Sequence, residues 1–185
     1  MADILILSGP PGAGKTTVAL ALADRYDRVA HVQTDVLRHL ITPTGFVRAH
    51  ATGRETEWRR QQHLAMRNAV SVSLNFIAER IGVIIDDVVP AEEDIAFFVE
   101  GLKPASAPIH HIRLQPGIEV AIERDDGRKT SRAGRARIEG VYRELAAWKL
   151  PVSVIDNTDL SAAEAADKLQ LLTTTGQSLV WAPEP

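Results

Sequence analysis

The sequence predicts an α/β fold of three layers, in which helices cover both faces of a five-stranded parallel sheet. Short apolar runs typical of buried strands alternate along the chain with longer segments of helical character. The two clearest strands are residues 4–7 and 83–88, which begin with uninterrupted apolar runs. Three more strands are expected at residues 29–33, 109–114 and 152–156.

Helices are expected between these strands. Their predicted ranges are 18–23, about 34–41, 54–80, 91–101, a helix reaching about residue 148, and 161–172. The longest helix shows an apolar stripe at spacings of three and four residues, formed by Met66, Val70, Leu74, Ile77 and Ile81. Gly82 ends this helix, and Pro90 ends the strand that follows it.

The chain of 185 residues predicts one domain with a sizeable core, spanning residues 1–185. It shows no internal repeat, low-complexity segment or interdomain linker. The tail at residues 173–185 has no clear period, although Leu179, Val180 and Trp181 could pack back onto the domain. Its oligomeric state is expected to be a monomer or a weak dimer.

Composition excludes several classes of function. The apolar content of 45% and the charged content of 24% are ordinary for a soluble globular protein, and the net charge of −3 disfavours a general nucleic-acid binder. The absence of cysteine excludes disulfides and thiolate metal sites. No signal peptide and no apolar run of membrane-spanning length are visible. We therefore expect a cytoplasmic protein without a membrane partner.

A glycine-rich segment directly after the first strand is the strongest motif. It matches the pattern G-x-x-x-x-G-K-[ST], and the helix predicted at 18–23 follows it at once. Glycines let the backbone curl so that successive N–H groups form an anion nest, to which the helix dipole adds positive potential. We expect the triphosphate of a nucleotide to bind here, in contact with Gly9, Pro11, Gly12, Ala13, Gly14, Lys15, Thr16 and Thr17.

Two residues of this segment have specific expected roles. Lys15 would reach the β- and γ-phosphates, and the hydroxyl group of Thr16 would bind Mg²⁺. Asp86 ends an apolar strand and is expected to hold the same metal ion, or a water bound to it, opposite Thr16. Asp87 could share this task or could simply face solvent.

The carboxyl ends of parallel strands are where ligands bind in such sheets. Asp35 and Arg38 follow the second strand and lie one helical turn apart. Asp35 could accept the proton of an acceptor hydroxyl while Arg38 holds the acceptor or a phosphate. The alternative is a helix cap next to an exposed arginine.

An arginine-rich region at about residues 123–137 is expected to form a lid over the nucleotide. Arg124 and Arg128 are four residues apart, so that one helical face could present both to a triphosphate. The remaining cationic residues of this region fit a solvated basic face; they are Lys129, Arg132, Arg135 and Arg137.

Three further groups of residues lie outside these motifs. The adjacent His110 and His111 would point to opposite faces of a strand, so packing is expected rather than a shared metal. An insertion at about residues 42–62 should line the acceptor side, where the candidates are Arg48, His50, Trp58, Arg59 and Gln62. Asn157 and Thr158 follow the fifth strand, where a loop commonly borders the base of the nucleotide.

Gly9 to Thr17, the Asp35-x-x-Arg38 element, Asp86 and the arginine-rich region together resemble the small P-loop kinases. This group includes shikimate kinase, gluconate kinase, chloramphenicol phosphotransferase, zeta-toxin-type kinases and the kinase domain of polynucleotide kinases. The resemblance implies the sheet order 2-3-1-4-5, ATP with Mg²⁺, and transfer of the γ-phosphoryl group to a hydroxyl. It also implies Lys15 as phosphate clamp, Thr16 as metal ligand, Asp35 as base, and Arg124 and Arg128 as the lid.

Departures from particular members limit the resemblance. The second strand ends in the single acid Asp35, and no glycine triplet follows the third strand, so shikimate is not supported as the substrate. Asn157-Thr158-Asp159 lacks the N-K-x-D pattern of GTPases. The sequence therefore predicts an ATP-dependent kinase of a small hydroxyl compound. One alternative is a kinase of polynucleotide or nucleotide-sugar hydroxyls, and another is an ATP-binding switch without kinase turnover.

Overall fold

A computed structural model describes residues 3–48, 51–129, 132–150 and 152–184. Five parallel strands form the sheet in the order β2-β3-β1-β4-β5, which confirms the predicted fold class and strand order. The strands are β1 (Ile4–Ser8), β2 (Val29–Gln33), β3 (Gly82–Asp86), β4 (Ile109–Leu114) and β5 (Ser153–Ile155). Residues 29–33 and 109–114 form strands with the predicted bounds.

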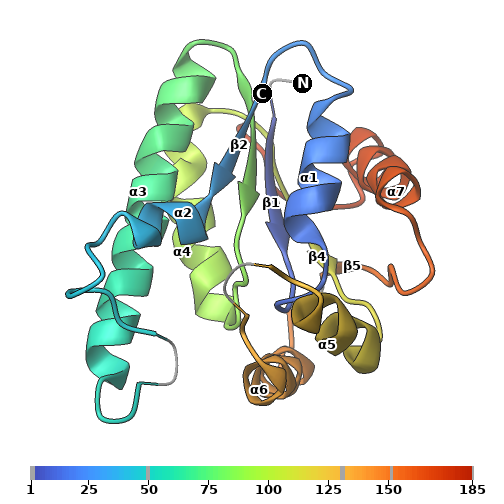
Figure 1. Cartoon of the computed structure of the whole chain (residues 1–185). Helices are drawn as coiled ribbons and strands as arrows, with labels where there is room; N and C mark the ends of the chain where they lie inside the picture. Colours follow the sequence, from blue (N-terminus) through green and yellow to red (C-terminus); the bar gives the residue numbers. More distant parts are fainter. Residues whose placement is uncertain (1–2, 49–50, 130–131, 151, 185) are drawn as a thin grey trace.

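Seven α-helices and one short 3₁₀ turn lie within the described ranges. They are α1 (Lys15–Ala23), α2 (Thr34–His39), α3 (Glu55–Ala78), α4 (Glu92–Leu102), the turn η1 (Lys103–Ala105), α5 (Ile118–Asp126), α6 (Arg135–Ala146) and α7 (Ala162–Thr174). Helices α3 and α4 cover one face of the sheet, and α1 and α7 cover the other (Figure 1). Helices α5 and α6 lie beyond the carboxyl ends of the strands.

The central strands are buried on both faces, which explains their apolar composition. Along β1, Ile4 and Ile6 pack in the core beneath α3 and α4, whereas Leu5 and Leu7 pack in the core beneath α1 and α7. Side chains of a strand alternate between the two faces, so one continuous apolar run supplies both cores. Strands β1 to β5 all run in the same direction, so their carboxyl ends lie at the same edge of the sheet.

A sixth strand, β6 (Leu179–Trp181), corrects the predicted number of five. It pairs antiparallel with the first half of β4, through Ile109 with Trp181 and His110 with Leu179. The short β5 pairs only with the second half of β4, from Ile112 to Leu114. The first half of that edge is therefore free to pair with the tail, whose three-residue strand is too short to show a period in the sequence.

The arginine-rich region also differs from the prediction. Helix α5 was not expected; it begins at Ile118, directly after Gly117, and ends at Asp126. Residues 127–134 then link it to α6, so the connection between the helices is shorter than the predicted lid at 123–137. Residues 55–62 of the predicted acceptor-side insertion form the first turns of α3.

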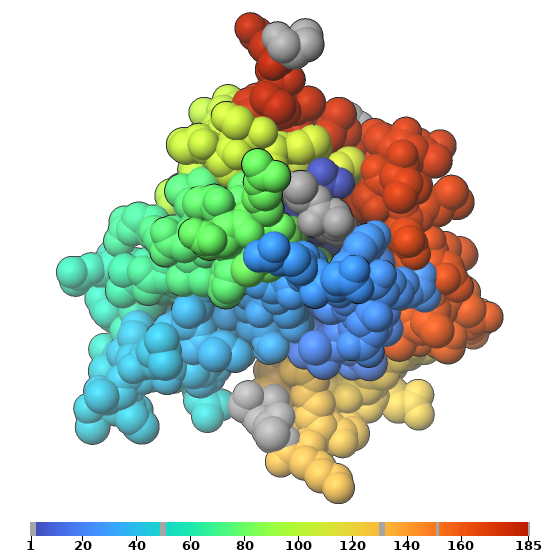
Figure 2. Space-filling model, turned by 90° about the horizontal axis from the view of Figure 1, so that it is seen from above, coloured from blue at the N-terminus to red at the C-terminus, as the bar shows by residue number. Residues whose placement is uncertain are grey.

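Figure 2 views the molecule from the end where the parallel strands begin. The connection between α1 and β2 (blue) lies between α3 and α4 (green) on one side and α7 (red) on the other. Among the described residues, no helix combines the length and the apolar character that a membrane span requires.

The adjacent histidines of β4 occupy opposite faces of the sheet, as predicted, and each binds a different serine. His111 Nε2 lies 2.8 Å from Ser8 Oγ, and His110 Nδ1 lies 3.0 Å from Ser178 Oγ. Both histidines are buried. Burial, together with the nearby Arg113 guanidinium, lowers the pKa of His111 to about 3. His111 is therefore neutral in the folded protein.

A buried neutral histidine makes stability depend on pH. The pKa of His111 is about 3 when folded and about 6.5 when unfolded, so the unfolded chain binds the extra proton below about pH 6.5. His111 should therefore reduce the free energy of unfolding by about 1.4 kcal/mol per pH unit as pH falls from about 6.5 towards 3. Urea titrations between pH 7 and pH 5 should show a shallower decline for His111→Gln, whose amide can still bind Ser8.

The exposed His63 is the matched control, and His63→Gln should retain the decline of the parent protein. Identical slopes for the parent protein and His111→Gln would contradict the assignment of a buried neutral imidazole.

Candidate active site

The loop between β1 and α1 packs its backbone against two neighbouring elements. Gly9, Gly12 and Gly14 have φ angles of +146°, +80° and +83°, which side chains with a Cβ rarely adopt. A Cβ on Gly9 would lie 2.2 Å from the carbonyl oxygen of Leu114, and one on Gly12 would lie 2.0 Å from that of Ala121. Glycine is therefore required at both contacts, with β4 and with α5.

The start of α1 offers free backbone N–H groups. The first hydrogen bond of the helix runs from Val18 N to the carbonyl oxygen of Gly14, at 3.0 Å. The N–H groups of Lys15, Thr16 and Thr17 therefore have no acceptor within the helix. Together with the helix dipole, these groups form a site suited to phosphate oxygens.

Lys15 is buried at the same place. Its ammonium group donates hydrogen bonds to the carbonyl oxygens of Gly9 (3.0 Å) and Pro10 (3.1 Å). Burial lowers the pKa of Lys15, and the nearby Asp86 carboxylate opposes that effect. The cation is thus held inside the loop, next to the N–H groups of the helix start.

Thr16 and Asp86, the two residues predicted to hold Mg²⁺, lie in direct contact. Thr16 Oγ1 donates a hydrogen bond of 2.6 Å to Asp86 Oδ2, and His31 Nε2 lies 3.4 Å from the same oxygen. Burial acts to raise the pKa of Asp86, but contacts with His31, Lys15 and Thr16 outweigh it, so this pKa lies below its ordinary value. An ionised carboxylate beside a hydroxyl fits Mg²⁺, which prefers oxygen ligands.

A cavity of about 1050 Å³ joins this loop to the acceptor side and to the arginine-rich region. It is large enough for a nucleotide and a small second ligand. Its lining brings together most of the predicted site residues, namely Pro11, Gly14, Lys15, Thr16, Thr17, Asp35, Arg38, Asp86, Asp87 and Arg128. The lining does not include Gly9, Gly12, Ala13, Arg124, Asn157 or Thr158.

Asp35 and Arg38 form an ion pair within the first turns of α2. Arg38 Nη2 lies 3.2 Å from Asp35 Oδ1, and the Asp35 side chain is 68% exposed. Asp35 directly follows Thr34, where β2 meets α2 at the carboxyl edge of the sheet. Its carboxylate is therefore accessible from the cavity that Lys15 also lines.

Asp87 is buried and contacts the acceptor side. It accepts hydrogen bonds from Val88 N (2.7 Å) and from Gln62 Nε2, which is 3.3 Å from both carboxylate oxygens. Burial raises the pKa of Asp87 to about 7, although the Val88 N–H group acts in the opposite direction. Asp87 thus links the end of β3 to α3.

The acceptor-side loop is fixed by a residue that the sequence analysis did not single out. Gln61 is buried on α3; its Oε1 accepts a hydrogen bond from Val47 N at 2.9 Å, and its Nε2 donates one to the carbonyl oxygen of Gly45 at 2.7 Å. Arg48, Trp58 and Gln62 line the cavity, whereas Arg59 does not. His50 lies outside the described residues.

The two predicted lid arginines do not share a helical face. Helix α5 ends at Asp126, so Arg124 lies on the helix and Arg128 follows it. Arg124 Nη2 donates hydrogen bonds of 3.1 Å to the carbonyl oxygens of Asn157 and Thr158, whereas Arg128 lines the cavity. The buried Asp125 holds the returning chain, because its Oδ2 accepts bonds from the backbone N–H groups of Ala133 and Gly134, each at 2.9 Å.

Asn157 stabilises the phosphate-binding loop through a hydrogen bond to its backbone. It is buried, and its Nδ2 donates a hydrogen bond of 2.9 Å to the carbonyl oxygen of Ala13. Thr158 Oγ1 accepts a hydrogen bond of 2.7 Å from Gly117 N. These contacts join the β5–α7 connection to the loop and to the start of α5. The sequence suggested instead that Asn157 and Thr158 border the base of the nucleotide.

The acceptor side of the cavity carries two aromatic rings and two arginines. The Arg38 guanidinium carbon lies 4.8 Å from the centre of the Phe46 ring, and that of Arg137 lies 5.7 Å from the centre of the Trp58 ring. Arg137 was assigned to a solvated basic face, but burial lowers its pKa, and its side chain is only 12% exposed. That assignment is wrong, because α6 turns Arg137 towards α3.

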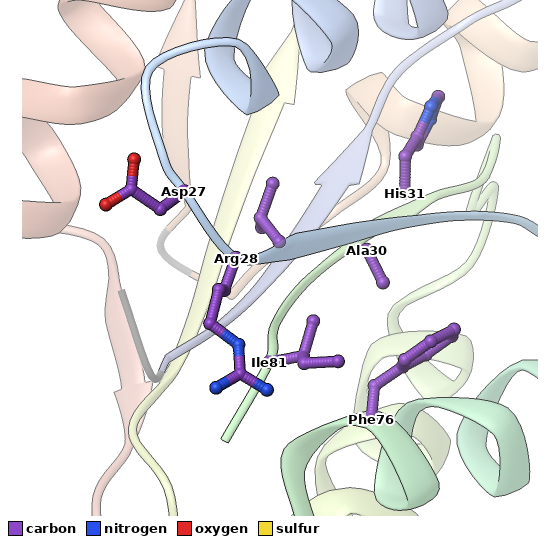
Figure 3. Close-up of a pocket in the computed structure, with 7 residues that line it drawn as sticks. Asp27, Arg28, Ala30, His31, Phe76 and Ile81 are labelled. Atoms are coloured by element: carbon purple, nitrogen blue, oxygen red, sulfur yellow. The ribbon is translucent and has the colours of Figure 1, made fainter. Parts of the chain in front are cut away.

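A second cavity, of about 450 Å³, lies where β2 begins, at the other end of that strand (Figure 3). Ala30 and His31 extend to opposite sides of β2, and Phe76 and Ile81 line the lower part of the view. Its only charged lining residues among those described are Asp27 and Arg28, if histidine is left aside. Lys15, Asp35 and Asp86 line the larger cavity and not this one, whereas His31 lines this one.

Comparison with known proteins identifies the family. A family model described as an AAA domain matches residues 4–149, which include the phosphate-binding loop, both acidic strand ends and the arginine-rich region. The chain belongs to this AAA domain family. A search of curated protein sequences found no significant match.

Solved structures with the same fold confirm the resemblance to small P-loop kinases at the level of fold. The tunicamycin resistance protein of Deinococcus radiodurans is 19% identical, with a TM-score of 0.67 and full coverage of both chains. A sugar kinase from Janibacter sp. is 16% identical, with a TM-score of 0.68 and 94% of each chain covered. The APS kinase of Mycobacterium tuberculosis, solved with AMPPNP and APS, is 18% identical, with a TM-score of 0.64 and coverage of 93% and 97%.

The contact of Gly12 with α5 can be tested by adding a single methyl group. In Gly12→Ala the new Cβ would collide with the Ala121 backbone, so we expect a lower Tm and loss of nucleotide binding. Gly53→Ala is the matched control, because Gly53 has a similar φ of +74° but nothing within 4 Å of its Cβ position. Gly53→Ala should lose only the stability that a left-handed alanine costs, about 1–2 kcal/mol.

Thermal unfolding and isothermal titration with MgAMPPNP measure both effects. Equal losses of stability in the two variants, with unchanged nucleotide affinity, would show that the close approach to Ala121 does not shape the loop.

Proposed function

We propose that this AAA domain transfers the γ-phosphoryl group of ATP to a hydroxyl group of a small molecule. One observation carries the proposal: the glycine-rich loop with Lys15 and Thr16, the Asp86 carboxylate and the separate, accessible Asp35 carboxylate all line one cavity. Kinases among the solved structures of the same fold support this class of reaction. The cavity is of the size that binds two small ligands together.

On the nucleotide side, the loop would hold the triphosphate through the N–H groups of Lys15, Thr16 and Thr17. The Lys15 ammonium group would exchange its two backbone carbonyl partners for phosphate oxygens. Arg128 would approach the transferred group from the lid. Thr16 and Asp86 would hold Mg²⁺, which neutralises charge on the β- and γ-phosphate oxygens when bound.

On the acceptor side, Asp35 would accept the proton of the attacking hydroxyl group. The oxygen of the acceptor forms a bond to the γ-phosphorus, the bond from that phosphorus to the bridging oxygen of ADP breaks, and the proton passes to the carboxylate of Asp35. Arg38 orients Asp35 through its ion pair at 3.2 Å. Asp35 is largely exposed here, so an acceptor can reach it without rearrangement of the core.

Removal of the Asp35 carboxylate should separate nucleotide binding from phosphoryl transfer. Asp35→Ala should bind MgAMPPNP with nearly the parent affinity, because Asp35 lies outside the phosphate-binding loop. Its rate of transfer should fall by about 10²- to 10⁴-fold, the usual contribution of a positioned base. Labelled ATP, screened against sugars, nucleosides, aminoglycosides and oligonucleotides, measures the transfer.

Lys15→Ala is the control that should lose both nucleotide affinity and transfer. Equal ATP hydrolysis by the parent protein and Asp35→Ala, with no compound phosphorylated, would contradict the kinase proposal and favour a nucleotide-dependent switch.

A further inference from the structure

His31 is in contact with both cavities of the molecule. It lies on β2 and lines the second cavity, where Figure 3 shows it on the side of the strand opposite to Ala30. Its imidazole also reaches Asp86, whose carboxylate lines the larger cavity, and His31 Nε2 lies 3.4 Å from Asp86 Oδ2. One side chain thus borders the second cavity and contacts the predicted metal ligand.

The register of β2 and β3 explains this contact. In the parallel pairing, His31 lies beside Ile84, and Gln33 lies beside Asp86. Ile84 packs in the core beneath α1 and α7, and side chains two residues apart share a face, so His31 and Asp86 both point towards α1. Thr16 comes from α1 and meets the same carboxylate. Asp86 is therefore contacted from a neighbouring strand and from a helix.

The nitrogen of His31 that faces Asp86 is buried. The side chains of His31 and Asp86 are only 9% and 6% exposed. Nε2 makes no regular hydrogen bond to any residue that the structure describes, and its contact with Asp86 is longer than an ordinary hydrogen bond. Buried N–H groups are nearly always satisfied in folded proteins, so the Asp86 carboxylate is the acceptor available to a proton on Nε2.

Both contacts are made by the same oxygen of Asp86. Thr16 Oγ1 donates to Oδ2 at 2.6 Å, and His31 Nε2 lies 3.4 Å from Oδ2. Burial acts to raise the pKa of Asp86, and the contact with His31 is the strongest of the effects that lower it. Two contacts from separate elements restrict the rotation of the carboxylate more than either contact does alone.

We propose that His31 is a positioning residue for Asp86, and that its Nε2–H group holds the carboxylate in the orientation that binds Mg²⁺ together with Thr16. This inference rests on the proposed function for the presence of the metal ion. Groups that hydrogen-bond a ligating carboxylate fix its orientation, and their loss typically lowers metal affinity by about 10- to 100-fold. His31 thus acts on metal affinity through Asp86 alone.

The effect of Mg²⁺ on nucleotide affinity measures this role. Isothermal titration gives the affinity for AMPPNP in EDTA and in excess Mg²⁺, and the ratio of the two affinities reports metal binding. His31→Leu removes the donor and keeps an apolar side chain, so this ratio should fall by about tenfold or more while the affinity in EDTA stays unchanged. His31→Gln, whose amide nitrogen can replace Nε2, should keep most of the parent ratio.

Val29→Ala is the matched control for a purely structural effect. Val29 lies on the same strand and face as His31, lines the second cavity and packs against the core beneath α1 and α7. Its truncation should lower the Tm and leave the ratio of affinities unchanged. Asp86→Asn is the reference for loss of the ligand itself, and its ratio should fall at least as far as that of His31→Leu. AMPPNP binding in EDTA shows that each variant is folded.

Two results would overturn the proposal. In one, His31→Leu keeps the parent ratio or loses no more of it than Val29→Ala. In the other, His31→Leu loses affinity equally in EDTA and in Mg²⁺, so that the phosphate-binding loop rather than the metal site is disturbed. If Mg²⁺ does not change the AMPPNP affinity of the parent protein, the metal site of the proposed function is itself refuted, and the role of His31 with it.

Discussion

The whole site depends on how tightly the chain turns between β1 and α1. Only six residues separate Ser8 from Lys15, and within them the backbone touches the end of β4 and the first turn of α5. Those contacts leave no room for a side chain at Gly9 or Gly12, which sets the direction of α1 and aims its free N–H groups at the carboxyl edge of the sheet. Asn157 holds the same turn from the other side through Ala13. Strand β4, helix α5 and the β5–α7 connection thus converge on one short piece of backbone.

Charge is distributed around this turn in two distinct ways. Near the loop, buried groups compensate the Asp86 charge, since contacts with Lys15 and His31 hold the pKa of Asp86 below its ordinary value. On the acceptor side of the cavity, the Arg38 and Arg137 guanidinium groups lie against the rings of Phe46 and Trp58. Charge near the loop is therefore balanced by opposite charge, whereas the two arginines on the acceptor side lie against aromatic rings.

Patterns that depend on neighbouring residues could be predicted from the sequence. The strands 29–33 and 109–114, the start of α7 next to Ser161 and the contact between the end of β3 and Thr16 follow from apolar runs and from a motif with fixed spacing. Features that depend on contacts between residues distant in the sequence could not be predicted in this way. Strand β6 exists because β5 leaves half of the β4 edge unpaired. Arg124 turns to the carbonyl oxygens of a loop 33 residues away, and Arg137 is buried only because α6 packs near α3.

A crystal structure with MgAMPPNP tests the central claim most directly. The account predicts that the β- and γ-phosphates lie against the N–H groups of Lys15, Thr16 and Thr17. It also predicts that Lys15 Nζ leaves the carbonyl oxygens of Gly9 and Pro10, now at 3.0 and 3.1 Å, to contact phosphate oxygens. Phosphates bound elsewhere, with Lys15 still on those two carbonyls, would contradict it.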